Sequence, residues 1–323
     1  MSPAAFIVPT GIGASIGGFA GDASVFAREI AKTTQLIVNP NVINAACFSG
    51  ITPNMLYTEG FALDEFFQGK IALRPTENNK IGVIFDKAIP QNILNIHINT
   101  INAVKTVYGI DIFTHIITEE PVGIEFCLEE SGISSGCVNN PKTLIKAGEI
   151  LKSQGAKALA VVCFFDEPEE DNYSSGQCVD IIGGVEAVIS HILTKELQLP
   201  AAHAPAFGDI SITDKVVDPR AAAEYITPTF LPCILLGLQN APQLVPIEKV
   251  QKDDITVNQL KALIMPYNSL GCVPVLEANK RKIPIIAVCE NITVLDVTAE
   301  KLGIEVVEMQ SYDEAKKVLD KLT

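Results

Sequence analysis

Short runs of apolar residues, each ended by a turn residue or a charge, recur along the chain and alternate with longer amphipathic stretches. The clearest apolar runs are Ala5–Val8, Ile81–Phe85, Ala158–Phe165 and Phe230–Gly237. Runs that are apolar at every position are typical of strands buried on both faces of a parallel sheet. All of them are much shorter than the roughly 18–20 residues that a membrane-spanning helix needs. The pattern therefore predicts buried strands and no membrane span.

Amphipathic helices are predicted between these strands, at Ala23–Thr33, Gln91–Tyr108, Pro141–Gln154 and Ile181–Leu197. Strands that alternate with helices are typical of βαβ units, in which the strands run parallel. The predicted fold class is therefore α/β, with a layered, mostly parallel sheet, helices on both faces and a Rossmann-like arrangement.

One stretch interrupts this alternation and predicts a domain boundary. Residues 241–256 combine Pro242 and Pro246 with mixed charge, as linkers often do. We expect a main α/β domain over 1–240, which carries a glycine-rich loop near its N-terminus, and a smaller C-terminal α/β lobe over 257–323. This lobe either stands alone or adds strands to the same sheet. Within it, Val257–Ile264 is predicted to be a helix.

Composition limits the class of protein. The chain has 323 residues, of which 48% are hydrophobic and 19% are charged, so it can form a packed core. Its net charge of −14 repels phosphate backbones and argues against nucleic acid as a partner. The N-terminus lacks a basic segment, and the eight cysteines form no C-x-x-C and lie mostly in apolar runs. We expect a cytoplasmic protein with reduced, buried cysteines. The sequence leaves open whether the protein forms a homo-oligomer.

The strongest local signal is a glycine-rich loop between the first strand and the first helix. Five glycines fall within eleven positions: Gly11, Gly13, Gly17, Gly18 and Gly21. Such a loop lets a ligand approach the backbone, and the helix start beyond it offers N–H groups to an anion. The spacing is one residue too long for the dinucleotide fingerprint, and no P-loop lysine follows. We expect the loop to bind an anionic group, with a tight structural turn as the alternative.

The same loop contains Ser15 within a G-x-S-x-G pattern, which raises the question of a serine nucleophile. Asp180 and His203 follow in the order found in α/β-hydrolases. A nucleophile elbow needs its strand to run directly into the first glycine, whereas several residues intervene here. A small residue in a glycine-rich turn is therefore the favoured interpretation, and Ser15 is kept as a candidate ligand contact.

The chain has four histidines, and two of them are candidate catalytic residues. His97 and His115 lie in apolar periodic segments and are expected to be hydrogen-bonded core residues. His191 lies on a predicted helix on the same face as Asp180. His203 is predicted to lie in a loop made rigid by Pro200 and Pro205, where it would act as general acid or base, tuned by Asp180. No H-x-x-x-H or H-E-x-x-H spacing supports a metal site.

Polar residues in other predicted loops are candidate ligand contacts. Asn140 precedes a predicted helix, Asn268 lies in a loop between two predicted helices, and Glu290 and Asn291 follow the strand Pro284–Val288. In parallel sheets, ligands bind outside the carboxyl ends of the strands, so these residues are expected to converge. The stretch around Asn268 also resembles the nucleotide-sugar half of two-lobed glycosyltransferases.

Sequence blocks spread over nearly the whole chain resemble an uncharacterised protein family, a domain of unknown function found in cyanobacteria and plant plastids. The blocks are Pro9–Ala23, Asn41–Asn44, Pro53–Gly60, Leu73–Pro75, Ile189–Ala206, Asp218–Glu224, Thr229–Gln243 and Glu290–Gly303. The resemblance implies a cytoplasmic or stromal setting and transfers no activity and no catalytic residue.

Together these observations predict an enzyme that acts on a small anionic metabolite, phosphorylated or nucleotide-linked, by group transfer or hydrolysis. The ligand would be held by the Gly11–Gly21 loop, and the sequence specifies no cofactor. A non-catalytic ligand-binding or regulatory protein is the alternative. A metal-dependent enzyme is a weaker one.

Overall fold

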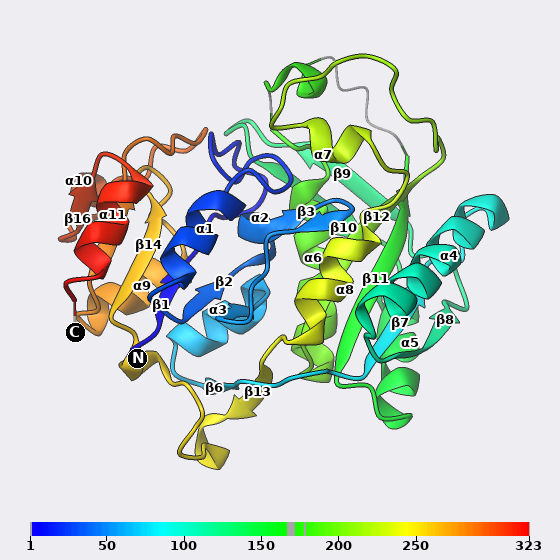
Figure 1. Cartoon of the computed structure of the whole chain (residues 1–323), viewed down its shortest axis with the longest axis horizontal. Coiled ribbons are helices and arrows are strands. Elements are labelled where there is room, and N and C mark those ends of the chain that lie inside the picture. Colours follow the sequence, from blue (N-terminus) through cyan, green and yellow to red (C-terminus); the bar gives the residue numbers. More distant parts are fainter. Residues whose placement is uncertain (1, 167–171, 178, 323) are drawn as a thin grey trace.

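The structure, a computed structural model, describes residues 2–166, 172–177 and 179–322 and contains two parallel sheets (Figure 1). The larger sheet has the strand order β16-β15-β14-β1-β2-β5, and all its neighbouring strands are parallel. Counted along the chain, this is the 3-2-1-4-5-6 order of the Rossmann fold. Its strands are β1 (Ala4–Phe6), β2 (Leu36–Val38), β5 (Met55–Tyr57), β14 (Ala262–Pro266), β15 (Ile285–Val288) and β16 (Val307–Met309).

The smaller sheet is inserted in the chain between β5 and β14 and has the order β12-β11-β7-β8. Its neighbouring strands are parallel as well. The strands are β7 (Ile81–Phe85), β8 (Ile112–Ile117), β11 (Ala158–Phe165) and β12 (Ala201–Phe207). The prediction of an α/β fold with parallel strands is thus confirmed, with the strands divided between two sheets. The segment 257–323 supplies β14 to β16 to the sheet that begins with β1.

Helices and short antiparallel ribbons make up the other described elements. The helices are α1 (Ser24–Ala31), α2 (Pro40–Ile43), α3 (Gly60–Phe67), α4 (Gln91–Tyr108), α5 (Pro141–Ser153), α6 (Gly183–Leu197), α7 (Ala222–Tyr225), α8 (Leu231–Gln239), α9 (Val273–Lys280), α10 (Ala299–Leu302) and α11 (Tyr312–Leu319). The ribbons pair β3 (Asn44–Ala45) with β4 (Phe48–Ser49), β6 (Ile71–Arg74) with β13 (Gln243–Pro246), and β9 (Ile124–Leu128) with β10 (Ser134–Val138). Short 3₁₀ turns are η1 (Tyr173–Ser175), η2 (Ile247–Lys249) and η3 (Val257–Gln259).

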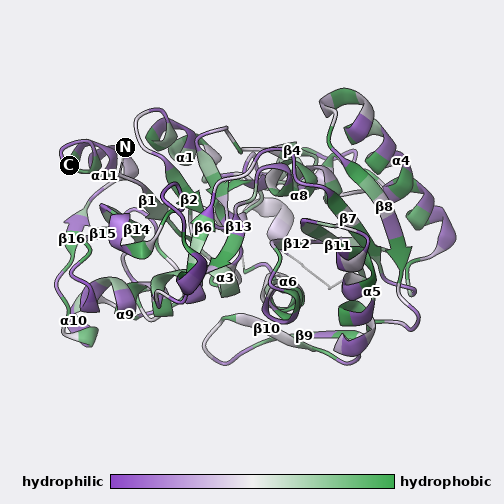
Figure 2. Cartoon of the chain, turned by 90° about the horizontal axis from the view of Figure 1, so that it is seen from below, coloured by the Kyte–Doolittle hydropathy of each residue, from purple (hydrophilic) through white to green (hydrophobic). Residues whose placement is uncertain are grey.

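Both faces of each sheet are covered by helices. On the larger sheet, α1 and α11 pack on one face, and α3 and α9 pack on the other. On the smaller sheet, α4 and α8 cover one face, and α5 and α6 cover the other. Figure 2 shows hydrophobic colour on α8, between the two sheets, and much hydrophilic colour on outer helices such as α11. Within the described part of the chain, every helix falls short of the length and apolar character of a membrane span.

The apolar core continues from one sheet into the other. Alternate residues along β1 and just beyond it point to opposite faces: Ala4 and Phe6 join one apolar cluster, and Ala5 and Ile7 join another. The first cluster also contains Val83 of β7 and apolar residues of α8. The two sheets are therefore joined by shared side-chain packing as well as by the chain.

Two predicted elements have a different secondary structure. Phe230–Gly237 was predicted to be a strand, but this stretch forms most of helix α8, with Pro232 in its first turn. A short run that is apolar all round also fits a buried helix, and periodicity alone does not separate the two. Val257–Ile264 was predicted to be a helix and instead forms the turn η3 followed by the start of β14.

Two expectations about burial are also corrected. His97 is buried, and its Nδ1 lies 3.0 Å from the Ile93 carbonyl oxygen, as predicted, whereas His115 is exposed on β8. Cys127 and Cys137 are exposed on the β9–β10 ribbon, although the cysteines were expected to be buried. The seven cysteines within the described residues are free, and Cys178 lies outside them.

A buried asparagine holds β1 and β2 together where both strands end. The Asn39 amide accepts a hydrogen bond from the Val8 N–H at 3.1 Å and donates one to the Val8 carbonyl oxygen at 2.7 Å. Val8 is fully buried, so water cannot replace these bonds. The side chain thus extends the backbone pairing beyond the last residues of both strands.

Replacing Asn39 by alanine should therefore lower the free energy of unfolding by about 1–3 kcal/mol, because it leaves the buried Val8 N–H without its side-chain partner, while the Val8 carbonyl oxygen keeps a longer bond of 3.3 Å from the Asn41 amide. Urea denaturation followed by circular dichroism measures the change. The matched control is Asn102→Ala on the exposed face of α4, which should stay within about 0.5 kcal/mol of the wild type. Equal effects of the two substitutions would contradict the role assigned to Asn39.

Candidate functional site

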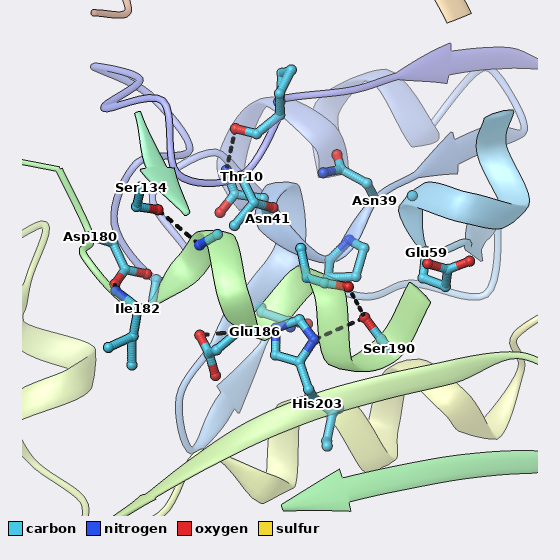
Figure 3. Close-up of a pocket in the computed structure, with 18 of the residues that line it drawn as sticks. Thr10, Asn39, Asn41, Glu59, Ser134, Asp180, Ile182, Glu186, Ser190 and His203 are labelled. Carbon is cyan, nitrogen blue, oxygen red and sulfur yellow. Dashed lines mark hydrogen bonds and ion pairs between the residues drawn. The ribbon is translucent and has the colours of Figure 1, made fainter. Parts of the chain in front are cut away.

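A cavity of about 410 Å³ lies where the carboxyl ends of β1, β2 and β5 face helix α6 and strand β12 (Figure 3). A volume of this size is typical of sites for small molecules. The larger sheet contributes Thr10, Asn39 and Glu59 to its wall. Residues of the inserted segment form the opposite wall, so the cavity is shared between the two sheets.

Helix α6 carries acid, hydroxyl and imidazole groups into this cavity. Glu186 and Ser190 are four residues apart and therefore lie on one face of the helix. Asp180 precedes the helix, and its Oδ1 accepts hydrogen bonds from the N–H groups of Ile182 and Gly183, at 3.1 and 3.2 Å. Asp180 thus fixes the start of the helix, and burial raises its pKa to about 6.

His203 lies in strand β12, and its ring is held by a serine of α6. Its Nδ1 lies 3.0 Å from Ser190 Oγ, which in turn donates to the Ala187 carbonyl oxygen at 3.1 Å. A Ser190 hydroxyl that donates to Ala187 can accept from Nδ1–H, and in that arrangement Nε2 is left with its lone pair. Burial lowers the pKa of His203 to about 3, so the ring is neutral at pH 7.

Glu186 faces this lone pair from the other side. Its Oε2 lies 3.9 Å from His203 Nε2, and its buried Oε1 has no hydrogen-bond partner among the described residues. Burial raises the pKa of Glu186 well above its usual value, and the charges of Asp180 and Glu224 raise it further. Burial thus favours the protonated form of Glu186 and the neutral form of His203, and the two side chains lie side by side.

A second carboxyl–imidazole pair lies on the wall formed by α3. Glu59 begins this helix: its oxygens accept hydrogen bonds from the N–H groups of Phe61 and Ala62, at 2.9 and 2.6 Å. His191 Nε2 lies 3.4 Å from Glu59 Oε2. Burial raises the pKa of Glu59 to about 7 and lowers that of His191.

The structure brings together the three predicted catalytic residues, with changes in their surroundings. His203, His191 and Asp180 all line the cavity, as does Gly18 of the glycine-rich loop. His203 was placed in a loop, but it pairs with Val161 across the parallel strands β11 and β12. The carboxyl group facing its Nε2 is that of Glu186, whereas Asp180 was expected to tune it. Their catalytic roles stay predictions.

Most of the glycine-rich loop packs against protein. The N–H groups of Ser15, Ile16 and Gly17 donate to Ile292 O, Asn291 Oδ1 and Asp22 Oδ1. A Cβ at Gly11, where φ is +72°, would lie 2.2 Å from Ser134 Oγ. Among the five glycines predicted to bind ligand, Gly18 lines the large cavity, while Gly11, Gly13, Gly17 and Gly21 do not. Close packing of the chain therefore accounts for much of the glycine content.

A smaller cavity of about 10 Å³ lies beneath this loop, between Gly11, Gly13 and Asp180. Its volume is about that of one water molecule, which is too small for a phosphate or carboxylate group.

Ser15, Glu290, Asn291 and Asn268 tie loops together beyond the ends of β1, β14 and β15. Ser15 Oγ donates to the Glu290 carbonyl oxygen at 3.1 Å, and Asn291 bonds both the N–H and the carbonyl oxygen of Ile16, at 3.0 and 2.8 Å. Asn268 Nδ2 donates to the Thr293 carbonyl oxygen at 3.0 Å. These predicted ligand contacts do not line the large cavity.

Asn140 lies apart from both groups of residues. Its side chain donates to the Pro121 carbonyl oxygen at 3.4 Å, at the start of α5. The expected convergence of all these polar residues on one site is therefore not observed, because the bonds between loops occupy their side chains.

Glu59, Glu186 and Ser190 are among the cavity residues that the sequence analysis did not predict. Glu59 comes two residues after the end of β5, so the rule that polar residues after parallel strands form sites would have selected it. Glu186 is an acid within the otherwise apolar run Val185–Ile189, which is a signal in itself. Ser190 carried no such signal, because its importance depends on packing against β12.

The described cavity wall is rich in acid and lacks cationic side chains other than histidine. It includes Glu59, Asp64, Asp180, Glu186 and Glu224, and no lysine or arginine among the residues that the structure describes. Within the same residues, no three His, Cys, Asp or Glu side chains are grouped so that they could hold a metal ion. The wall is thus suited to hydrogen bonding and proton transfer.

Comparison with known proteins shows a match to a protein family and to a curated protein. A family model described as "Protein of unknown function (DUF3326)" matches residues 3–322. A curated protein from Synechococcus sp., described as an uncharacterized lipoprotein, is 38% identical over 314 residues, which cover 96% of this chain and 87% of the relative. No solved structure matches the chain.

The raised pKa of Glu59 predicts a dependence of stability on pH. The folded chain holds this proton up to about pH 7, whereas the unfolded chain loses it near 4.5, so stability falls as the pH rises through this window. Glu59→Gln removes the ionisation and keeps an oxygen for the helix start. Relative to this variant, the wild type should lose about 2–3 kcal/mol between about pH 5 and pH 8.

Urea denaturation at both pH values measures this difference, with Glu149→Gln on the exposed face of α5 as the matched control. A difference between wild type and Glu59→Gln that does not change with pH would show that Glu59 is ionised throughout.

Proposed function

The chain belongs to this DUF3326 family, as its sequence blocks predicted, and we propose from its own residues that it is an enzyme using acid–base chemistry on a small polar metabolite. Hydrolysis and group transfer are the reaction types that we favour, because both need a proton to be taken from an attacking group and given to a leaving group.

The observation that carries the proposal is the buried His203 ring, fixed by Ser190 and facing Glu186 inside the cavity. Nε2 is the ring atom that takes up and returns the proton. Ser190 acts through the ring: by accepting from Nδ1–H, it keeps the lone pair of Nε2 directed toward Glu186. A ring held on a strand and a helix is more precisely placed than one on a loop.

Glu186 sets the strength of this base. While its carboxyl group is protonated, the imidazole remains neutral and weakly basic. Once Glu186 is ionised, its negative charge 3.9 Å from Nε2 favours the protonated ring. A substrate that draws the proton away from Glu186 would therefore strengthen His203 as a base.

The cavity wall changes the expected charge of the substrate. An anionic metabolite would meet several carboxyl groups and no lysine or arginine among the described lining residues. The backbone N–H groups of Ser15, Ile16 and Gly17, which were expected to cradle an anion, already have acceptors. The proposal is therefore an uncharged or positively charged substrate, not the anionic one expected from the glycine-rich loop.

We also keep the cytoplasm as the proposed setting. The seven free cysteines among the described residues support a reducing compartment. The term lipoprotein describes the Synechococcus relative.

A metabolite-depletion assay tests the proposed function. The purified chain is incubated with the small-molecule fraction of a cyanobacterial lysate, and mass spectrometry follows which compounds disappear. His203→Asn should slow the disappearance at least 100-fold, which is within the usual range for loss of a general acid or base. Ser190→Ala should slow it less, because the ring keeps its nitrogen and loses only its orientation.

Glu149→Gln, an exposed change on α5, serves as the control and should retain full activity. Turnover that survives in His203→Asn would contradict the proposal. So would a compound that binds tightly and is never consumed, which would favour a non-catalytic binding or regulatory protein.

A further inference from the structure

We infer that the ligand of this cavity is a small organic cation, whose ammonium group binds to the carboxylate of Glu186. The inference rests on the proposed function in that it names the substrate class for the same cavity. It depends on binding alone, however, and can be tested in the absence of turnover.

The first support is an oxygen atom without a partner. Glu186 is 8% exposed, and its buried Oε1 receives no hydrogen bond from the described residues. Buried polar atoms are nearly always bonded, so an orphaned carboxyl oxygen on a cavity wall indicates a place for a donor from a ligand. An ammonium group supplies three such donors and a positive charge.

Neighbouring carboxyl groups already have partners from the protein. Asp180 accepts from two backbone N–H groups, and both oxygens of Glu59 accept from the start of α3. Glu224 Oε1 accepts from the Tyr173 hydroxyl at 2.7 Å and from the Ala20 N–H at 3.0 Å. These bonds leave the three acids in place as negative surroundings for a cation, while Glu186 has an oxygen to offer it.

The charges around Glu186 favour an incoming cation. Asp180 at the start of α6, Glu224 of α7 and Glu59 of α3 are acidic, and His203 of β12 and His191 of α6 are neutral in their surroundings. A bound ammonium group offsets the repulsion between these carboxylates. Binding then ionises Glu186: its proton leaves to solvent, and a carboxylate–ammonium pair replaces the neutral acid.

Aromatic rings on the wall favour an organic cation over a metal ion. Tyr173, Phe207 and Phe230 line the cavity, and the last two pack edge to face with ring centres 6.2 Å apart. Ring faces attract ammonium groups within about 6 Å. A bare metal ion would need several ligating side chains close together, and the described residues offer no such group.

Three four-carbon compounds that differ in charge test the inference: 1,4-diaminobutane, 1,4-butanediol and succinate. Isothermal titration calorimetry of the full chain at pH 7 should show diaminobutane binding at least tenfold more tightly than butanediol, and succinate weakest of all. Titration in two buffers of different ionisation enthalpy should show protons released on diaminobutane binding, because Glu186 gives up its proton.

Glu186→Gln keeps the shape of the side chain and removes its charge. This variant should bind diaminobutane at least tenfold more weakly and release fewer protons, whereas Glu149→Gln should match the wild type. The proton count on the wild type decides the question even if Glu186→Gln fails to fold.

Four results would overturn the inference. They are succinate binding as tightly as diaminobutane, diaminobutane binding without proton release, tighter binding of calcium ions than of diaminobutane, and no diaminobutane binding up to about 10 mM. The two proposals can fail separately. If the chain binds diaminobutane but consumes no metabolite, the proposed function is contradicted and this inference still holds. Turnover of an uncharged metabolite by a chain that binds no diaminobutane would keep the proposed function and remove this inference.

Discussion

The packing of apolar side chains between the two sheets is the interaction on which the cavity depends. Phe6 of the first strand and Val162 of the inserted sheet belong to one continuous cluster, together with apolar residues of α8. Core packing of this kind has a density close to that of organic crystals, and it fixes the distance between the elements that it joins. Glu59, on one side of the cavity, and Glu186 and His203, on the other, are thereby held at set positions before any ligand arrives.

The architecture follows from the sequence more completely than the site does. Ile81–Phe85 and Ala158–Phe165 are strands where the apolar runs predicted them, because parallel strands need little more than a buried run between turns. Helix α8 escaped recognition since its surroundings are apolar on all sides. Histidines are few enough to be weighed singly, so His191 and His203 were found. The contacts of Ser190 and Glu186 arise from the packing of α6 on β12, and no spacing along the chain records them.

The cavity does not lie at the place where the strand order of the larger sheet predicts a ligand site. In a Rossmann arrangement, the ligand site is expected beside β1 at the point where the strand order reverses, which here means next to β14. Bonds from Asn291 to Ile16 and from Val294 N–H to the Ile12 carbonyl oxygen draw the chain together across that point. The large cavity lies instead toward β2 and β5, where the inserted sheet supplies a wall. The glycine pattern therefore indicates where the backbone packs closely.

The inserted segment begins with β6 and ends with β13, and these two strands are neighbours. They pair with each other, and Arg74 lies opposite Gln243. Both ends of the insertion therefore lie side by side at one point of the molecule. The larger sheet with its own loops contains Glu59 and lacks Glu186, Ser190 and His203, which all belong to the inserted segment. The cavity is thus a composite: removing the insertion would leave the Rossmann-ordered strands in sequence and take away the helix and the strand that supply the acid, hydroxyl and imidazole groups.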